Sequence, residues 1–80
     1  MSIKQVLNHL RDVILQSNPE LSTSVIPIQR CEGDETNDIH LLWMINEIKT
    51  SEKMGLTKCH RWIGYVQGVL IMKGYTNVTE

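Results

Sequence analysis

Three histidines and two cysteines are the side chains of this sequence that could bind a metal or act in catalysis. They are His9, His40, His60, Cys31 and Cys59. No two histidines lie four residues apart, and the cysteines lack the close spacing that zinc sites use. Cys59 and His60 are neighbours, and neighbouring residues of a helix point about 100° apart, so they do not form a thiolate pair. With no phosphate loop or nucleophile motif either, we predict no metal, no cofactor, no catalytic residue and no enzyme activity.

The stretch from residue 31 to 38 is polar and acidic. The spacing of Asp34, Thr36 and Asp38 partly fits a calcium-binding loop, but that loop also needs a glycine at its sharp turn and a closing glutamate. Carboxylates at the start of a helix are favoured by the helix dipole. We therefore interpret these carboxylates as residues at the N-terminus of the helix that begins near residue 38.

Two glycines lie inside a segment that otherwise has the pattern of one amphipathic helix, "HRWIGYVQGVL". Each costs a helix interior about 1 kcal/mol relative to alanine. At about 100° per residue, both glycines lie away from the apolar face, where they leave a shallow groove. The predicted partner-binding residues are those on or near this face, together with an aromatic residue of the preceding helix. They are His60, Arg61, Gly64, Tyr65, Gln67, Gly68 and Trp43.

Three interpretations of the glycines remain open. In the first, the helix at the N-terminus or the segment Val25–Ile28 crosses them inside the same chain. In the second, they form the contact of a homodimer. In the third, they form a floor at backbone level for a ligand or a protein partner.

The elements that must position these residues are three helices, predicted at about 2–16, 38–54 and 57–73. We expect Ser2 and Gln5 to form a capping box, Gly55 and Gly74 to end the later helices, and Thr57 to begin the last one. The helix over 38–54 is apolar on two sides, which predicts a central position. The chain is therefore predicted to be all-α, with a long irregular connection over 17–37. Whether Val25–Ile28 forms a strand is left open, although Pro27 disfavours one.

Size and composition predict one small globular domain over residues 1–80. Hydrophobic residues make up 41% and charged residues 21%, which is ordinary for a folded protein. A formal net charge of −1 disfavours a nucleic-acid partner, although residues 1–40 carry −3 and residues 41–80 carry +2. No apolar run approaches the roughly 20 residues of a membrane span, and no signal peptide is evident. We expect a cytoplasmic protein with both cysteines reduced.

Residues 38–75 resemble small uncharacterised proteins of tailed bacteriophages and prophages. The resemblance is carried by "IHLLWM" at 39–44 and by "RWIGYVQG" at 61–68, where that family has an R-W-[IL]-G-[FY]-[IV]-Q-G helix. The family has no assigned activity, so the resemblance implies a bacterial host cell and not a mechanism.

These observations predict a non-enzymatic phage accessory protein that binds a host bacterial protein and inhibits or redirects it. The alternative is a module that sequesters a small ligand or nucleotide, in a dimer groove where Lys58, His60 and Arg61 would receive phosphates.

Overall fold

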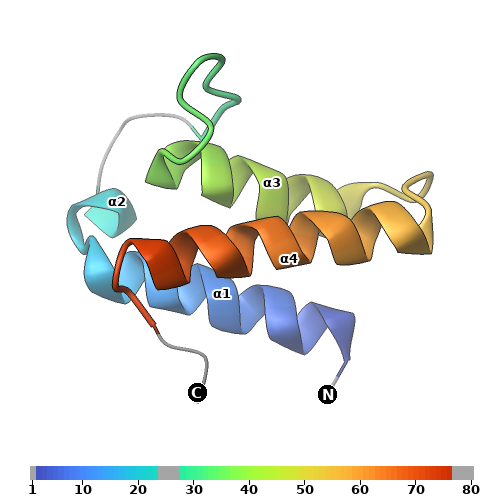
Figure 1. Ribbon diagram of the computed structural model, residues 1–80, viewed down its shortest axis with the longest axis horizontal. Coiled ribbons are helices and arrows are strands. Elements are labelled where there is room, and N and C mark those ends of the chain that lie inside the picture. Colours follow the sequence, from blue (N-terminus) through green and yellow to red (C-terminus); the bar gives the residue numbers. More distant parts are fainter. Residues whose placement is uncertain (1, 24–27, 77–80) are drawn as a thin grey trace.

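The protein is a bundle of three main helices and one short helix, in a computed structural model that describes residues 2–23 and 28–76. The helices are α1 (Ile3–Ser17), α2 (Glu20–Thr23), α3 (Asp38–Thr50) and α4 (Leu56–Met72). α3 runs antiparallel to both α1 and α4, so α1 and α4 run in the same direction (Figure 1). The predicted all-α class and its three main helices are confirmed. No strand occurs in the described residues.

α1 follows the sequence pattern closely. The Ser2 hydroxyl accepts a hydrogen bond from the backbone N–H of Gln5, and the Gln5 side chain accepts one from the N–H of Ser2, which is the expected capping box. Leu7, Leu10 and Ile14 are buried on one face. Asn18 ends the helix, because the following proline disfavours helical geometry there.

The boundary between α3 and α4 differs from the prediction. α3 ends at Thr50 with Ser51 as its C-cap, four residues before the predicted end, so Gly55 is not its stop. The Thr50 hydroxyl donates to the carbonyl of Asn46, and the extended backbone at Ser51 ends the helix. Gly55 is instead the N-cap of α4, which makes the prediction of Thr57 as the N-cap wrong. Gly74 follows α4 with φ of 78°, as expected for a helix stop.

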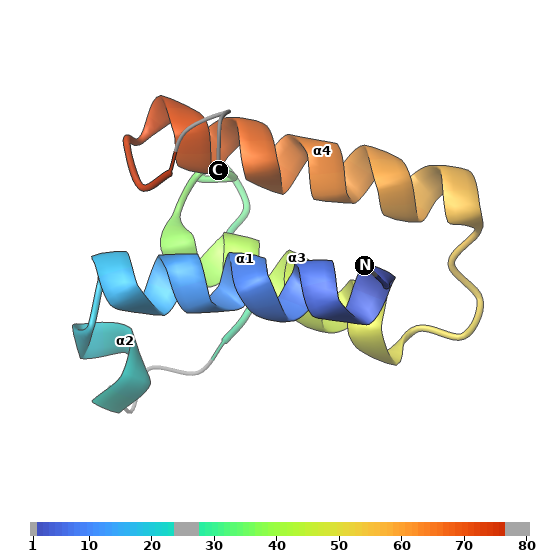
Figure 2. The same cartoon turned by 90° about the horizontal axis from the view of Figure 1, so that it is seen from below.

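The hydrophobic core lies where the three main helices meet, and Figure 2 shows α4 packed alongside the pair α1 and α3. Each main helix contacts the other two, so α3 is a full member of the bundle rather than a helix enclosed by the others. The buried apolar residues are Leu7, Leu10, Ile14, Leu41, Leu42, Met44, Ile45, Ile48, Ile63, Val66, Val69 and Leu70. None of the helices in the described ranges is both long and apolar enough to cross a membrane.

The connection between α1 and α3 is only partly described. α2 is a single helical turn after Pro19, within the stretch predicted as an irregular connection. The open question of a strand at Val25–Ile28 falls largely outside the described residues, since only Ile28 belongs to them. Ile28 lies beside Leu42 and Ile45 of α3 and remains 53% exposed. The loop after it projects from the start of α3 (Figure 1).

Candidate functional site

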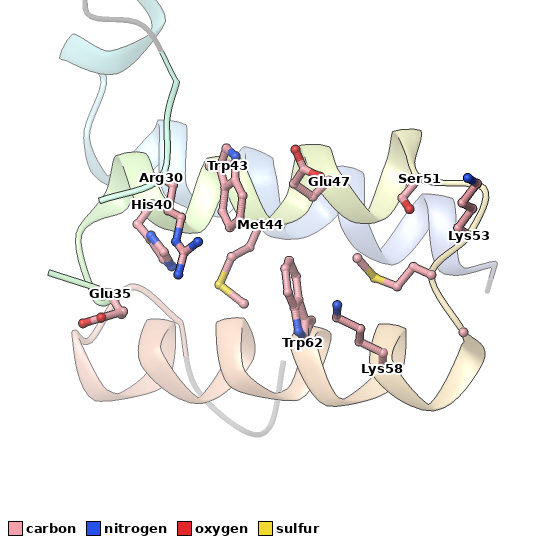
Figure 3. A pocket seen from close by; sticks show the side chains of 12 residues that line it. Arg30, Glu35, His40, Trp43, Met44, Glu47, Ser51, Lys53, Lys58 and Trp62 are labelled. Atoms are coloured by element: carbon pink, nitrogen blue, oxygen red, sulfur yellow. The ribbon is translucent and has the colours of Figure 1, made fainter. Parts of the chain in front are cut away.

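A concave surface lies between α3 and α4, and we call it the α3–α4 groove. It has a volume of about 580 Å³, which lies in the range of ligand and peptide sites in proteins. Its middle is apolar: Figure 3 shows Met44 and Trp62 projecting into the space between the two helices, with Trp43 behind them. A surface of this kind can bind a molecule.

A row of three aromatic rings runs along the α3–α4 groove. The ring centroids of His40 and Trp43 are 5.4 Å apart, and those of Trp43 and Trp62 are 5.8 Å apart. Lys58 continues the row, with its ammonium nitrogen 5.1 Å from the centroid of Trp62. Tilted rings at these separations attract one another, and a cation over a ring adds to that attraction. The row therefore holds α3 against the first turns of α4.

His40 is buried, and its hydrogen bonding fixes the orientation of its ring. Its Nδ1 accepts a hydrogen bond from the backbone N–H of Cys31 at 3.0 Å. In the neutral ring, the proton must then be on Nε2. Within the described residues, no side-chain nitrogen or oxygen that is fully buried lacks a partner. His40 thus ties the loop before α3 to the groove.

The outer face of α4 consists of His60, Gly64, Gln67, Gly68 and Ile71, all of which are exposed. A Cβ atom built on Gly64 or Gly68 meets no atom of residues 2–23 and 28–76 within 4 Å. The interpretation that α1 crosses these glycines within the chain is therefore wrong. Val25–Pro27, the rest of that interpretation, lies outside the described residues. Ile71 is 38% exposed and Met72 is 70% exposed, so the face next to the glycines is partly apolar.

The predicted partner-binding residues do not form one patch. Trp43 lines the α3–α4 groove, whereas the glycines lie on the outer face of α4. Trp62 lines the groove and Gly64 follows it by two residues, which places them on nearly opposite sides of the helix at about 100° per residue. The same spacing separates Lys58 from His60, so one chain does not present both to a single phosphate. Arg61 and Tyr65 lie between the two surfaces.

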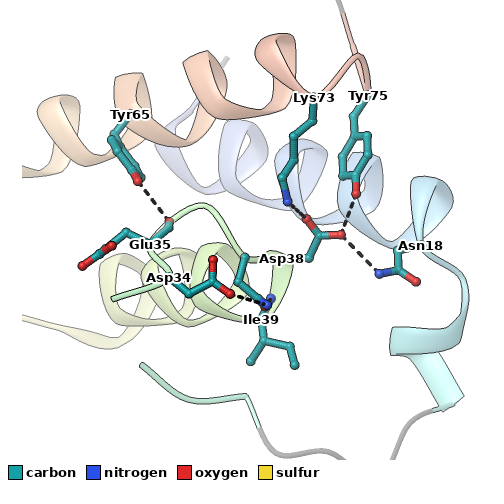
Figure 4. Close-up of polar contacts among 9 residues, drawn as sticks. Asn18, Asp34, Glu35, Asp38, Ile39, Tyr65, Lys73 and Tyr75 are labelled. Atoms are coloured by element: carbon teal, nitrogen blue, oxygen red, sulfur yellow. Dashed lines mark hydrogen bonds and ion pairs between the residues drawn. The ribbon is translucent and has the colours of Figure 1, made fainter. Parts of the chain in front are cut away.

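Tyr65 has a partner inside the chain. Its hydroxyl donates to the backbone carbonyl of Glu35 at 3.0 Å (Figure 4). The ring is still 40% exposed. Tyr65 therefore fixes the acidic loop to α4, and its exposed ring remains available for an external contact.

Asp38 is the centre of the most elaborate polar group, which we call the Asp38 cluster. Its carboxylate accepts from the ammonium of Lys73, from the hydroxyl of Tyr75 at 2.8 Å and from the amide of Asn18 at 3.2 Å (Figure 4). Burial raises the pKa of Asp38, but the hydrogen bonds from Lys73, Tyr75 and Asn18 and the charge of Lys73 outweigh it, so the pKa is lowered. The cluster joins the start of α3 to the residues that follow α1 and α4, which indicates a structural role.

The α3–α4 groove was not predicted from the sequence. Lys58 was predicted only in an alternative phosphate site, and Trp62 and His40 were given no binding role, yet these three residues line the groove. One sequence signal could have indicated this groove. Lys58 and Trp62 are four residues apart, so they share one side of a helix, and Trp43 on the preceding helix is a possible partner for them. Within residues 2–23 and 28–76, no group of three or more His, Cys, Asp or Glu side chains could hold a metal ion.

The chain was compared with known proteins at the level of both sequence and structure. No family model, no curated protein and no solved structure matches it.

Alanine substitution at the two glycines tests whether the outer face of α4 is open. We expect Gly64→Ala and Gly68→Ala each to raise the free energy of unfolding by about 0.5–1 kcal/mol, because alanine is the better helix former and its methyl group meets no neighbour. Urea denaturation followed by circular dichroism measures this change. A loss of stability in either variant would show that the face is covered within the chain.

Proposed function

We propose that this protein is a non-enzymatic binding protein that docks the outer face of α4 on another protein. The observation that carries the proposal is the open space above Gly64 and Gly68. Each glycine weakens α4 by about 1 kcal/mol, and no contact among the described residues offsets that cost. If the backbone of another protein approaches α4 closely at these two positions, that contact explains why both residues are glycine.

The chemistry of the face supports a protein partner. Gly64 and Gly68 allow a helix or strand to approach at backbone level, and the exposed side chains of Ile71 and Met72 add apolar area beside them. His60, Arg61 and Gln67 supply polar contacts at the edge, and arginine is frequent among residues that dominate binding energy. The resemblance of residues 38–75 to phage proteins supports a host bacterial protein, in the cytoplasm, as the partner that is inhibited or redirected.

Substitution of one glycine by leucine tests the proposal. We expect immobilised Gly64→Leu protein to capture at least about tenfold less of its partners from a bacterial lysate than the wild type, because a bulky side chain blocks close approach. Since the space above Gly64 is open, the variant is expected to fold. Quantitative mass spectrometry of the captured proteins gives the ratio.

A matched control places the same side chain elsewhere. Gln16 is exposed on α1, and Gln16→Leu adds a similar apolar surface away from α4. This variant is expected to capture the partners as the wild type does. A folded Gly64→Leu protein that still captures the same partners would exclude the outer face as the binding surface.

A further inference from the structure

The charges at the two ends of the α3–α4 groove are opposite, and they point to a second copy of this chain as the occupant of the groove. We propose that two copies pair through their α3–α4 grooves about a two-fold axis. The proposal concerns a different surface from the outer face of α4, and it stands or falls independently of the proposed function.

The first end of the groove is acidic. Glu35 and Arg30 line it, and the acidic character comes from the adjoining loop, which also exposes Glu32 and Asp34. Arg30 is the basic residue here, and its guanidinium lies 3.9 Å from the carboxylate of Glu32. With one basic against three acidic groups, residues 30–37 carry a net charge of −2. The loop projects beyond the helices (Figure 1), so it can reach a neighbouring molecule.

The second end is basic. Lys53 and Lys58 line it, and Arg61 follows Lys58 on α4. Glu52 is the acidic residue in this stretch, so residues 51–61 carry +2 with His60 neutral. Glu47 lines the groove between the two ends. If its charge is added to that of the basic end, the net charge of this end is still +1. α4 itself contains no acidic residue. Figure 3 shows Glu35 and the pair Lys53 and Lys58 at opposite ends of the groove.

A two-fold axis through the middle of the groove makes both contacts at once. It places the acidic loop of each copy on the basic end of the other, and it brings the apolar middles around Met44 and Trp62 together. A two-fold interface joins the same patch on both molecules, so the patch must be complementary to itself when reversed. An acidic end, an apolar middle and a basic end meet that condition. Complementary charges also fix the register and orientation of such an interface.

Charge reversal at either end is the first part of the test. We expect sedimentation experiments to find a dimer of the wild type at low salt, weakened by added salt because the charges are exposed. The first variant is Lys53→Glu/Lys58→Glu and the second is Glu32→Lys/Glu35→Lys. In a two-fold dimer of either variant, like charges face each other at both contacts between loop and basic end, so each variant alone is expected to dimerise about a hundredfold more weakly than the wild type. An equimolar mixture of the two variants restores both complementary contacts, and it is expected to form a heterodimer about as tight as the wild-type dimer.

A control is needed to show that the two variants associate through the groove and not merely because their net charges are opposite. Lys4→Glu/Arg11→Glu makes the same charge change on the exposed residues of α1. This variant is expected to remain a dimer alone, and to associate with the Glu32→Lys/Glu35→Lys variant far less than the Lys53→Glu/Lys58→Glu variant does. Because both tryptophans line the groove, their fluorescence gives a second readout of pairing on dilution.

Three outcomes would overturn the proposal. The first is a wild type that stays monomeric at millimolar concentration in low salt. The second is a dimer that survives reversal of Lys53 and Lys58. The third is a mixture with the α1 control that associates as well as the matched pair. A dimer that Gly64→Leu abolishes and the charge reversals leave intact would assign pairing to the outer face of α4 instead.

Discussion

Replacing Leu41 with alanine is expected to lower the free energy of unfolding by about 3 kcal/mol. Substitutions of this kind in a packed core cost about 2–5 kcal/mol, through lost burial and through the cavity that is left. Leu41 is 0% exposed and belongs to the cluster in which α1, α3 and α4 meet. A domain of this size has only about 4–12 kcal/mol of stability, so the loss is a large share of the total.

The same substitution at an exposed leucine provides the control. Leu56 is 63% exposed at the start of α4. Leu56→Ala removes the same atoms without opening a cavity and is expected to change the free energy of unfolding by less than about 0.5 kcal/mol. Equilibrium denaturation in urea gives both values. Equal losses in the two variants would show that Leu41 is not in the core.

Replacing Asp38 with alanine is expected to cost about 3 kcal/mol, in the range found when one partner of a buried ion pair is removed. The Lys73 ammonium, whose side chain is 24% exposed, loses its counter-charge, and Tyr75 and Asn18 lose their acceptor. Asp38→Asn keeps the shape and one acceptor oxygen, so it is expected to cost less. Thermal and urea unfolding of the three proteins rank them, and an alanine variant as stable as the wild type would contradict the role of the cluster.

The pH dependence of stability follows from the lowered pKa of Asp38. Because the folded protein favours the ionised carboxylate, this contribution is complete above the pKa of the unfolded chain, near 3.8, and is lost as the pH falls through the lower pKa of the folded state. Below pH 4 the wild type is therefore expected to lose its advantage over Asp38→Asn. Hydrogen bonding to Asp38, with burial, raises the pKa of Tyr75, so the contribution of Tyr75 is complete below pH 10 and is lost as the pH rises above that.

Local patterns predicted the helices because the forces involved act over one or two turns. Leu7, Leu10 and Ile14 are spaced so that they share one face of a helix, and Ser2 and Gln5 have the three-residue separation of a capping box. The boundary at Gly55 was missed because glycine serves equally as the end of one helix or the cap of the next. Only the extended backbone at Ser51 decides between them.

The sites could be predicted only in part, because they depend on contacts between distant residues. Helical angles alone placed Gly64 and Gly68 away from the apolar face of their helix, but they left open whether another part of the chain covers that face. The Asp38 cluster did not, because Asn18 lies 20 positions from Asp38 and Tyr75 lies 37 positions from it. The α3–α4 groove likewise arises only when Trp62 of one helix packs on Trp43 of another.

The position of Asp38's partners along the chain bears on how the protein is made. During synthesis, α1 and α3 leave the ribosome before Lys73 and Tyr75, which hold the carboxylate in the finished fold. Domains form as units when their chain becomes available. The Asp38 cluster therefore forms only after Lys73 and Tyr75 are themselves free of the ribosome. The contact between the start of α3 and the end of α4 belongs to the last stage of folding, when the whole of α4 is available to pack.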